Sequence, residues 1–346
     1  MRGLLIVIVA FGLVFSPAAF AQQARTTTLP PSLDRTINSG LTWLQKQQKD
    51  DGSFGSDLKP ALTGLSLLAF LASGHTPEVG RFGVTVRTAA DYLGNLNPEG
   101  GYFGRDESRM YGHCVVTLAL AEAYGTEVDE IQRRRIRSTL EKSLKVIYAG
   151  QDMRKEKPQF EGGWRYQPQS SDSDLSVSAW AMMAMRACES AGLPVPKARV
   201  DRAAAYLRRC YRPEQRGFSY QGEGEANAAM TGAALLNLYL LDAVDAELGG
   251  AASKFLIDKP VRDNTQHYYY ALYYTTQAAF QAGDPAWSAV WKNNSEQLLA
   301  SVGKDGSWPG KPDVPGNDQK NAKIYATAMS VLTLSVPLRV LPIYQR

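Results

Sequence analysis

A short turn that recurs along the chain constrains its fold more than any other feature. In each copy a glycine is followed by an aromatic residue, a polar loop and an apolar stretch with helical spacing. The copies are Asp51-Gly52-Ser53-Phe54, Gly100-Gly101-Tyr102-Phe103, Gly162-Gly163-Trp164, Arg216-Gly217-Phe218 and Asp305-Gly306-Ser307-Trp308. With the turn glycine taken at 52, 101, 163, 217 and 306, the spacing is about 50 to 60 residues, with one longer interval of about 90. Such a period indicates one supersecondary unit that repeats.

Two helical patterns flank each turn. The pattern before it is amphipathic, as in Arg202 to Arg209, which predicts a helix half exposed to water. The pattern after it is small and apolar nearly all round, as in Ala228 to Leu240, which predicts a buried helix. A further unit, from Ala251 to Phe280, keeps both patterns but lacks the turn. Six such hairpins predict an all-α fold, an α/α toroid (α6/α6 barrel) with a buried inner ring and a half-exposed outer ring.

The first residues have the pattern of an export signal. Arg2 supplies a positive charge, Leu4 to Phe15 form an apolar run, and Ala19-Phe20-Ala21 is a small-x-small cleavage site before Gln22. The apolar run is short for a membrane span, and no later segment is long and apolar enough to be one. We expect a cleaved signal peptide and an exported protein, periplasmic or secreted; an uncleaved anchor is the alternative.

These features divide the chain into three parts. Residues 1–21 are the signal peptide, residues 22–31 a polar, flexible leader, and residues 32–346 a single toroid domain. A hydrophobic fraction of 44% is ample for the core of such a domain.

Charge and cysteine usage exclude several classes of function. The chain has 38 Lys and Arg against 34 Asp and Glu, for a net charge of +4. The one basic run, Arg133 to Arg137, is typical of the exposed face of a helix, so we do not expect nucleic acid as a partner. Three cysteines are too few for a disulfide framework. We expect Cys114 and Cys188 in the core, with a Cys188 to Cys210 bridge left open.

The repeat resembles the prenyltransferase and squalene-oxidase repeat of terpenoid cyclases, such as squalene cyclase, and of protein prenyltransferases. In the squalene-cyclase version an aromatic residue and a spaced Gln precede Gly-x-Trp. The first unit has Gly40, Trp43, Gln47, Gly52 and Phe54, with Phe in place of Trp; the last has Leu298, Val302, Gly306 and Trp308, with Val in place of Gln. In any member, glycine permits the positive-φ turn, and the aromatic residue fills the gap between units.

Residues just inside each inner helix form the predicted site. If the units superpose, these positions surround one mouth of the toroid, where converging helix N-termini favour anions and carboxylates. Counting eleven or twelve residues beyond each glycine gives Thr63, His113, Asp174 and Ala228 with Asn227 beside it, while the pattern adds His267 and Tyr325 in the last two units.

Among the residues around this mouth, Asp172-Ser173-Asp174-Leu175 is the most specific motif. The resemblance to class II terpene cyclases implies that Asp174 matches the central acid of their Asp-x-Asp-Asp motif, with Asp172 before it. Leu175 replaces the final Asp, and those enzymes enclose the substrate with two such domains where this chain has one. The alternative is structural: Ser171 with Asp174 is a capping box, and two early aspartates suit a helix dipole.

The resemblance to protein prenyltransferases implies no zinc site here. Those enzymes hold zinc with an Asp, a Cys and a His, and the segment around His267 resembles the one that presents their His. The preceding unit has Asn227-Ala228-Ala229 in place of Asp-x-Cys. We therefore predict no metal and no cofactor, although His113, His267 and Asp174 together are suitable ligand types. Histidines hydrogen-bonded in a pocket or core are the other interpretation.

Aromatic residues are the predicted substrate contacts. The fifth inner helix carries Tyr270 and Tyr274 on one face, one helical turn apart, and Trp164 and Trp180 flank Asp174 in sequence. Such a wall suits a carbocation, a prenyl chain or a sugar face. Equally, the tyrosines simply fill the axis of the toroid.

Three functions remain open. The first is a terpenoid-cyclase-like or prenyltransferase-like enzyme that acts on an isoprenoid or other hydrophobic substrate, with Asp174 as the acid. The second is a non-catalytic toroid that has lost the family active sites and binds a hydrophobic small molecule or a partner protein. The third is a carbohydrate-active α/α barrel, in which Asp172 or Asp174 works with Glu161.

Overall fold

The computed structural model describes residues 29–312 and 318–345. The predicted signal peptide, residues 1–21, and most of the predicted leader lie outside the described residues, so both stay predictions. Within the described ranges the chain forms twelve α-helices, a few short 3₁₀ turns and one two-stranded sheet of β1 (Tyr211–Arg212) and β2 (Gly217–Phe218). The all-α prediction is confirmed.

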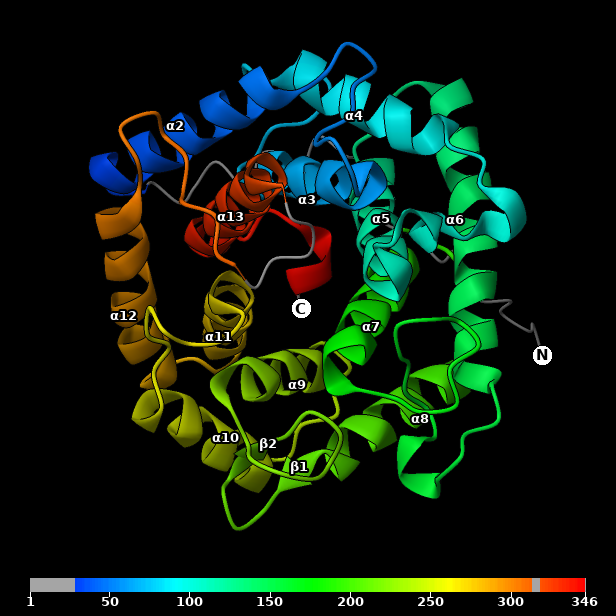
Figure 1. Cartoon of the computed structure of the whole chain (residues 1–346), viewed down its shortest axis with the longest axis vertical. Helices are drawn as coiled ribbons and strands as arrows, with labels where there is room; N and C mark the ends of the chain where they lie inside the picture. Colours follow the sequence, from blue (N-terminus) through cyan, green and yellow to red (C-terminus); the bar gives the residue numbers. More distant parts are fainter. Residues whose placement is uncertain (1–28, 313–317, 346) are drawn as a thin grey trace, which may run out of the picture.

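The helices form two concentric rings (Figure 1). The outer helices are α2 (Pro31–Gln47), α4 (Gly83–Asn95), α6 (Glu130–Asp152), α8 (Lys197–Arg209), α10 (Ala246–Asp258) and α12 (Ala286–Ser301). The inner helices are α3 (Lys59–Ala72), α5 (Arg109–Tyr124), α7 (Leu175–Ser190), α9 (Ala228–Leu240), α11 (Tyr268–Ala282) and α13 (Gln319–Leu334). Each inner helix packs against the next, and α13 packs against α3, which closes the ring. The chain is therefore the predicted α/α toroid of six hairpins.

The turn glycines join each unit to the following one. Gly52 has φ +84°, and a Cβ on it would lie 2.2 Å from the carbonyl oxygen of Thr88 in the next outer helix. Gly306 has φ +89°, and its Cβ would lie 2.7 Å from the carbonyl oxygen of Ser39 in α2. Only glycine combines this conformation with so close an approach. The last turn therefore contacts the first outer helix and completes the outer ring.

The turn position differs from the prediction in two units. In the third unit the residue with positive φ is Gly162, not Gly163, and in the fourth it is Arg216, not Gly217. Gly163 and Gly217 are required instead because no side chain fits there. A Cβ on Gly163 would lie 2.7 Å from the ring of Tyr206, and one on Gly217 would lie 2.9 Å from the ring of Phe255.

The aromatic residue after each turn is buried and tied to its inner helix. The exposure of these residues is 0 to 4% (Phe54, Phe103, Trp164, Phe218 and Trp308). The backbone N–H of each donates to a side chain of the inner helix, and the acceptors are Thr63, His113, Ser178, Thr231 and Thr327. This shared hydrogen bond fixes the structural register of five units.

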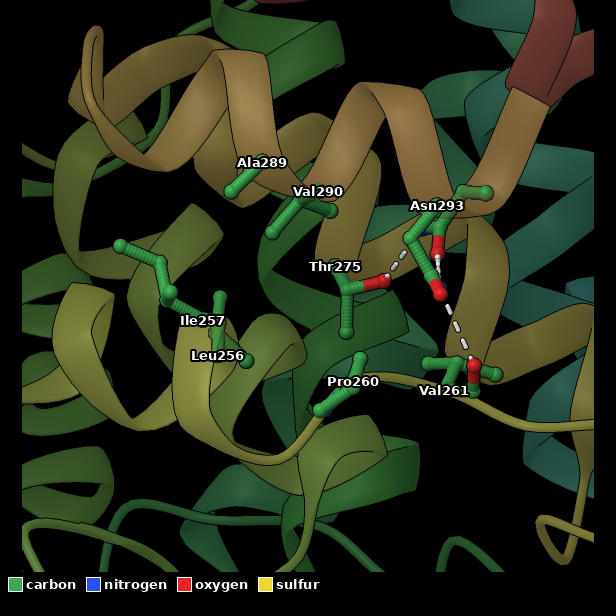
Figure 2. A pocket seen from close by; sticks show the side chains of 9 residues that line it. Leu256, Ile257, Pro260, Val261, Thr275, Ala289, Val290 and Asn293 are labelled. Carbon is green, nitrogen blue, oxygen red and sulfur yellow. Dashed lines mark hydrogen bonds between the residues drawn. The ribbon is translucent and has the colours of Figure 1, made fainter. Parts of the chain in front are cut away.

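The fifth unit replaces the missing turn with amide side chains. Asn293 of α12 donates through Nδ2 to the carbonyl oxygen of Val261 at 3.1 Å, and Gln297 donates to the same oxygen at 3.0 Å. Figure 2 shows the cleft that remains there, between α10, α11 and α12. Its volume is about 250 Å³ when the open side is included, but only about 20 Å³ of it is wide enough for a water molecule. The cleft is therefore a packing gap with room for about one water.

Two further predictions can be compared with the described residues. The thiols of Cys114, Cys188 and Cys210 are buried and unbridged, so the alternative of a Cys188 to Cys210 disulfide is wrong. Among helices in the described ranges, none has the length and apolar character needed to span a membrane.

Candidate functional site

Asp174 lies at the start of α7, at the end of the ring where the inner helices begin, here called the N-terminal mouth. Its side chain is fully buried. Oδ1 accepts hydrogen bonds from the backbone N–H of Val177 at 2.9 Å and from the Ser176 hydroxyl at 2.6 Å. Asp174 is therefore the N-cap itself, and the predicted capping box starting at Ser171 is wrong because that residue lies in the exposed loop before the helix.

Arg165 joins the two predicted catalytic aspartates. Its Nη1 lies 3.1 Å from Asp174 Oδ2, and its Nε lies 3.1 Å from Asp172 Oδ2. A single β-bridge between Trp164 and Asp174 brings the segments together, with the Asp174 N–H donating to the Trp164 carbonyl at 2.8 Å. The two carboxylates thus share one guanidinium rather than flanking a water-sized gap.

Tyrosines surround this ion pair. Arg165 Nη1 donates to Tyr220 Oη at 2.8 Å, and Tyr220 and Tyr166 share a hydroxyl hydrogen bond of 2.6 Å. Tyr111 shares a hydrogen bond with the Ser176 hydroxyl, and Tyr270 donates to the Ser176 carbonyl at 3.5 Å. Tyr111, Tyr166 and Tyr220 are partly exposed, so this tyrosine cluster forms the outer surface of the N-terminal mouth.

Burial controls the protonation of the cluster. It raises the pKa of Asp174 above the ordinary value, while the donors from Ser176, Val177 and Arg165 act in the opposite direction. Burial also raises the pKa of Tyr220 and Tyr270 well above 10, so both hydroxyls keep their protons at neutral pH. Burial thus favours the protonated form of Asp174, and three donors stabilise the anion that remains when the proton leaves.

A half-buried lysine holds the loop that presents Asp172. Lys155 Nζ donates to the backbone carbonyls of Ser170 and Asp172, each at 3.2 Å, and of Gly150 at 3.4 Å. Burial lowers the pKa of Lys155 to about 8.

The predicted aromatic contacts Trp180, Tyr270 and Tyr274 come together in the middle of the ring. The rings of Tyr270 and Tyr274 are 4.5 Å apart, and Trp180 contacts Tyr274 edge-on at 5.6 Å. Trp180 also stacks on Tyr273 at 6.2 Å. All four side chains are at most 8% exposed. The aromatic residues both form a wall beside Asp174 and fill the axis below it.

Two predicted site residues lie elsewhere. Trp164 points outward, and its Nε1 donates to the Ile147 carbonyl of α6 at 2.7 Å. His113 also points at α6, with Nε2 3.1 Å from the Ser143 carbonyl. His113 accepts the hydrogen bond from the aromatic residue after the turn, as Ser178 does in the third unit. His113 therefore corresponds to Ser178, which lies about one helical turn after Asp174. Counting from the glycines was wrong here because the loops between turn and inner helix differ in length.

The remaining predicted residues lie around the same mouth. Asn227 caps α9 by accepting from the Met230 N–H at 2.9 Å, and His267 is the exposed residue before α11, so both occupy the place that Asp174 has in α7. Tyr325 of α13 is partly buried and lies close enough to raise the pKa of Tyr270. The same position holds an amide in α9, an imidazole in α11 and a second carboxylic acid, Asp318, in α13.

No metal site is formed by the described residues. Within residues 29–312 and 318–345, no three side chains of His, Cys, Asp or Glu lie close enough to hold a metal ion. His113 faces Ser143 of α6, which separates it from the set with His267 and Asp174.

Sequence reasoning missed most of the network around Asp174. Arg165, Tyr166, Tyr220 and Tyr111 come from three loops or helix starts, and no fixed spacing links them. The one available signal was the charged Arg165 between two aromatic residues directly after the third turn.

An open polar hollow adjoins the tyrosine cluster. It spans about 690 Å³ including open solvent and is lined by Tyr102, Gly104, Arg105, Glu107, Gln167 and Gln169. Gln167 follows Tyr166 in sequence, and Tyr102 Oη donates to Gln167 at 3.3 Å. The hollow gives solvent access next to the mouth.

Solved structures of the same architecture include a terpene cyclase and a glycosidase. The type II terpene cyclase MstE from Scytonema, without ligand, is 14% identical with a TM-score of 0.58, covering 90% of this chain and 100% of its own. A variant of that cyclase in complex with geranylgeranyl dihydroxybenzoate, its substrate, is 12% identical with a TM-score of 0.56, covering 92% and 99%. A glycosidase variant in complex with glucose is 11% identical with a TM-score of 0.57, covering 91% and 100%.

These likenesses support the α/α toroid fold and extend over nearly the whole chain. At such low identity they concern the fold alone. In sequence, the chain matches no protein-family model and no curated protein.

Proposed function

We propose that this chain is a terpenoid-cyclase-like enzyme that binds a hydrophobic, unsaturated molecule at the N-terminal mouth and protonates it with Asp174. The observation that carries the proposal is the environment of Asp174: a fully buried carboxyl group at the base of a partly exposed tyrosine cluster. Acid attack on a carbon–carbon double bond requires a carboxyl group that carries a proton and an aromatic wall beside it, and the burial of Asp174 favours its protonated form.

The hydrogen-bond network suits an acid that must also lose its proton. When Asp174 is protonated, Asp172 still neutralises Arg165. When the proton leaves, Arg165, Ser176 and the Val177 N–H stabilise the carboxylate. The proton adds to one alkene carbon, and the cation at the other is attacked by a second double bond of the same molecule. The product cation then loses a proton to solvent and Asp174 regains one from solvent, so the overall reaction is an isomerisation.

The aromatic residues would stabilise the positive charge. The rings of Tyr270, Tyr274 and Trp180 pack against one another below Asp174, and ring faces attract cations. A substrate that is apolar apart from one polar end fits this lining. The open hollow with Gln167 and Arg105 offers the polar end a place in water.

A non-catalytic binding toroid is the second candidate. Tyr273 and Tyr274 are 0 to 1% exposed, so the axis is closely packed. Asp174 does not line any of four hollows in the described part of the chain. A binding protein needs only the tyrosine cluster, whereas an enzyme must move side chains to bring a double bond to Asp174.

An assay with matched variants separates these candidates. The purified protein is incubated with geranylgeraniol and with squalene, and cyclised isomers of unchanged mass are sought by gas chromatography and mass spectrometry. The variant Asp174→Asn retains a good N-cap and should fold. We expect it to lose at least about a hundredfold in turnover, the usual contribution of a general acid.

Asp172→Asn is the control. Asp172 shares Arg165 with Asp174 but is 31% exposed, so its loss should have a much smaller effect on turnover. Binding without conversion by the wild-type protein, measured by native mass spectrometry, would overturn the enzyme and support the binding toroid. Equal turnover by wild type and Asp174→Asn would show that Asp174 is not the acid.

A further inference from the structure

The end of the chain enters the ring. After α13 the chain forms two 3₁₀ turns, η5 (Val336–Leu338) and η6 (Pro342–Tyr344), and its C-terminus lies inside the inner ring in Figure 1. Leu341 and Ile343 are 5% and 0% exposed. Within residues 336–345, here called the C-terminal segment, Val336, Leu341 and Ile343 are thus buried like core residues although the segment belongs to neither ring.

The C-terminal segment bridges opposite sides of the ring. The Ile343 N–H donates to Glu122 Oε1 of α5 at 3.3 Å. On α11, Gln281 Nε2 donates to the Tyr344 carbonyl at 3.1 Å, and the Tyr273 and Tyr344 hydroxyls share a hydrogen bond. Two inner helices separate α5 from α11 in either direction around the ring. The segment therefore crosses the axis.

These contacts close the end of the ring opposite Asp174. Glu122 and Gln281 lie in the last turns of α5 and α11, whereas Asp174 lies before the first turn of α7. Each hairpin runs from outer to inner helix, so the inner helices all end at one side, here called the C-terminal mouth. Between the two mouths lies the aromatic layer of Trp180, Tyr273 and Tyr274.

The three side chains of the ring that hydrogen-bond the segment carry no fixed charge. Burial raises the pKa of Glu122 to about 8, so its carboxyl group is neutral at pH 7, and its Oε2 has no hydrogen-bond partner among the described residues. The other polar groups there are uncharged, the Tyr273 hydroxyl and the Gln281 amide. An apolar chain with a hydroxyl end matches these side chains as well as Leu341, Ile343 and Tyr344 do.

We propose that the C-terminal mouth is a second binding site for an apolar chain with a terminal hydroxyl group, and that the C-terminal segment occupies this site as a displaceable stopper. The proposal rests on the proposed function, since it assigns a place to the apolar part of the same class of ligand. Displacement of the segment uncovers Tyr273 and Trp180 from the side opposite Asp174.

Removing the stopper tests the proposal. A chain ending after Arg339 is compared with the full chain for binding of Nile red, a neutral apolar dye, with farnesol as the competitor. We expect the shortened chain to bind the dye at least tenfold more tightly and farnesol to release it. The double variant Ile343→Ala/Tyr344→Ala leaves the chain length unchanged and should give the same direction of change.

Gln345→Ala is the matched control. Its amide donates to the Arg339 and Val340 carbonyls within the segment, so dye binding should stay at the level of the full chain. In the unmodified protein, farnesol should speed hydrogen exchange at the Ile343 amide. Unchanged dye affinity in the folded double variant, together with unchanged exchange at Ile343, would overturn the stopper.

The dye-binding result tests the second site separately from the proposed catalysis by Asp174. Tighter dye binding without any turnover supports the stopper and removes only the acid role of Asp174. Turnover by the full chain without a gain in dye binding on removal of the stopper leaves the proposed enzyme intact and overturns the second site.

Discussion

Each mouth of the ring has a buried carboxyl group, but the two groups differ in their hydrogen-bond partners and in what covers them. At the N-terminal mouth Asp174 has a cation, a hydroxyl and a backbone N–H as partners, and the tyrosines around it are partly exposed. At the C-terminal mouth Glu122 has one backbone N–H on one oxygen, and the chain itself covers it. Burial raises the pKa of both groups.

Helix direction accounts for part of this difference. Asp174 precedes α7, where the helix dipole stabilises a negative charge, whereas Glu122 lies in the last turn of α5, where the dipole disfavours one. A toroid of parallel inner helices therefore has one end suited to an anion and one suited to neutral groups. The contrast favours proton transfer at the N-terminal mouth and apolar contacts at the other.

The greatest change in stability is expected at Glu122, the buried carboxyl group of the C-terminal mouth. Its pKa of about 8 exceeds the ordinary 4.5, so the folded state holds a proton that the unfolded state releases between these values. The stabilisation is complete below pH 4.5, falls by about 1.4 kcal/mol per unit as pH rises to about 8, and is absent above. Denaturant unfolding of wild type and Glu122→Gln should agree at pH 4 and differ by up to about 5 kcal/mol at pH 9, with the variant more stable.

Subtracting the two pH profiles cancels every other titrating group. Parallel profiles would mean that Glu122 is ionised at neutral pH, and the two mouths would then be alike in carrying a charge.

A smaller change in stability is expected at Asp174 of the N-terminal mouth. Asp174→Ala removes an N-cap and one partner of the largely buried Arg165, which should cost about 2 to 4 kcal/mol. Asn227→Ala removes the equivalent cap of α9 with no buried charge and should cost about 1 kcal/mol. Unfolding free energies at pH 7 measure both; equal losses would show that Arg165 adds nothing to the cap.

The repeat allowed the architecture to be predicted, but not the register of the ring. Gly52 and Gly306 must adopt a positive φ against the next outer helix, and that requirement is visible in sequence. The loop from turn to inner helix changes length between units, so counting placed His113 beside Asp174 although it faces α6. A hydrogen bond between Phe103 and His113, not a residue count, sets the register.

The networks at both mouths could not be predicted because they depend on irregular segments. Arg165 reaches Asp174 only after the loop between them folds back through the bridge at Trp164. The C-terminal segment has prolines and no helical or strand period, which indicates a tail rather than a buried element. Its burial follows from the space inside the ring, a property of the assembled fold.

The hydrogen bond between the Tyr273 and Tyr344 hydroxyls at the C-terminal mouth should contribute least to stability. Tyr344→Phe removes the hydrogen bond to Tyr273 but keeps the ring, so the loss should be about 1 kcal/mol or less. Thermal unfolding should show a small shift, hydrogen exchange at Ile343 should rise slightly, and turnover at Asp174 should not change. A loss as large as that of Asp174→Ala would mean that the segment is a structural part of the ring. The segment would then hold the C-terminal mouth permanently shut, since a stopper that can leave must be held by contacts of this modest strength.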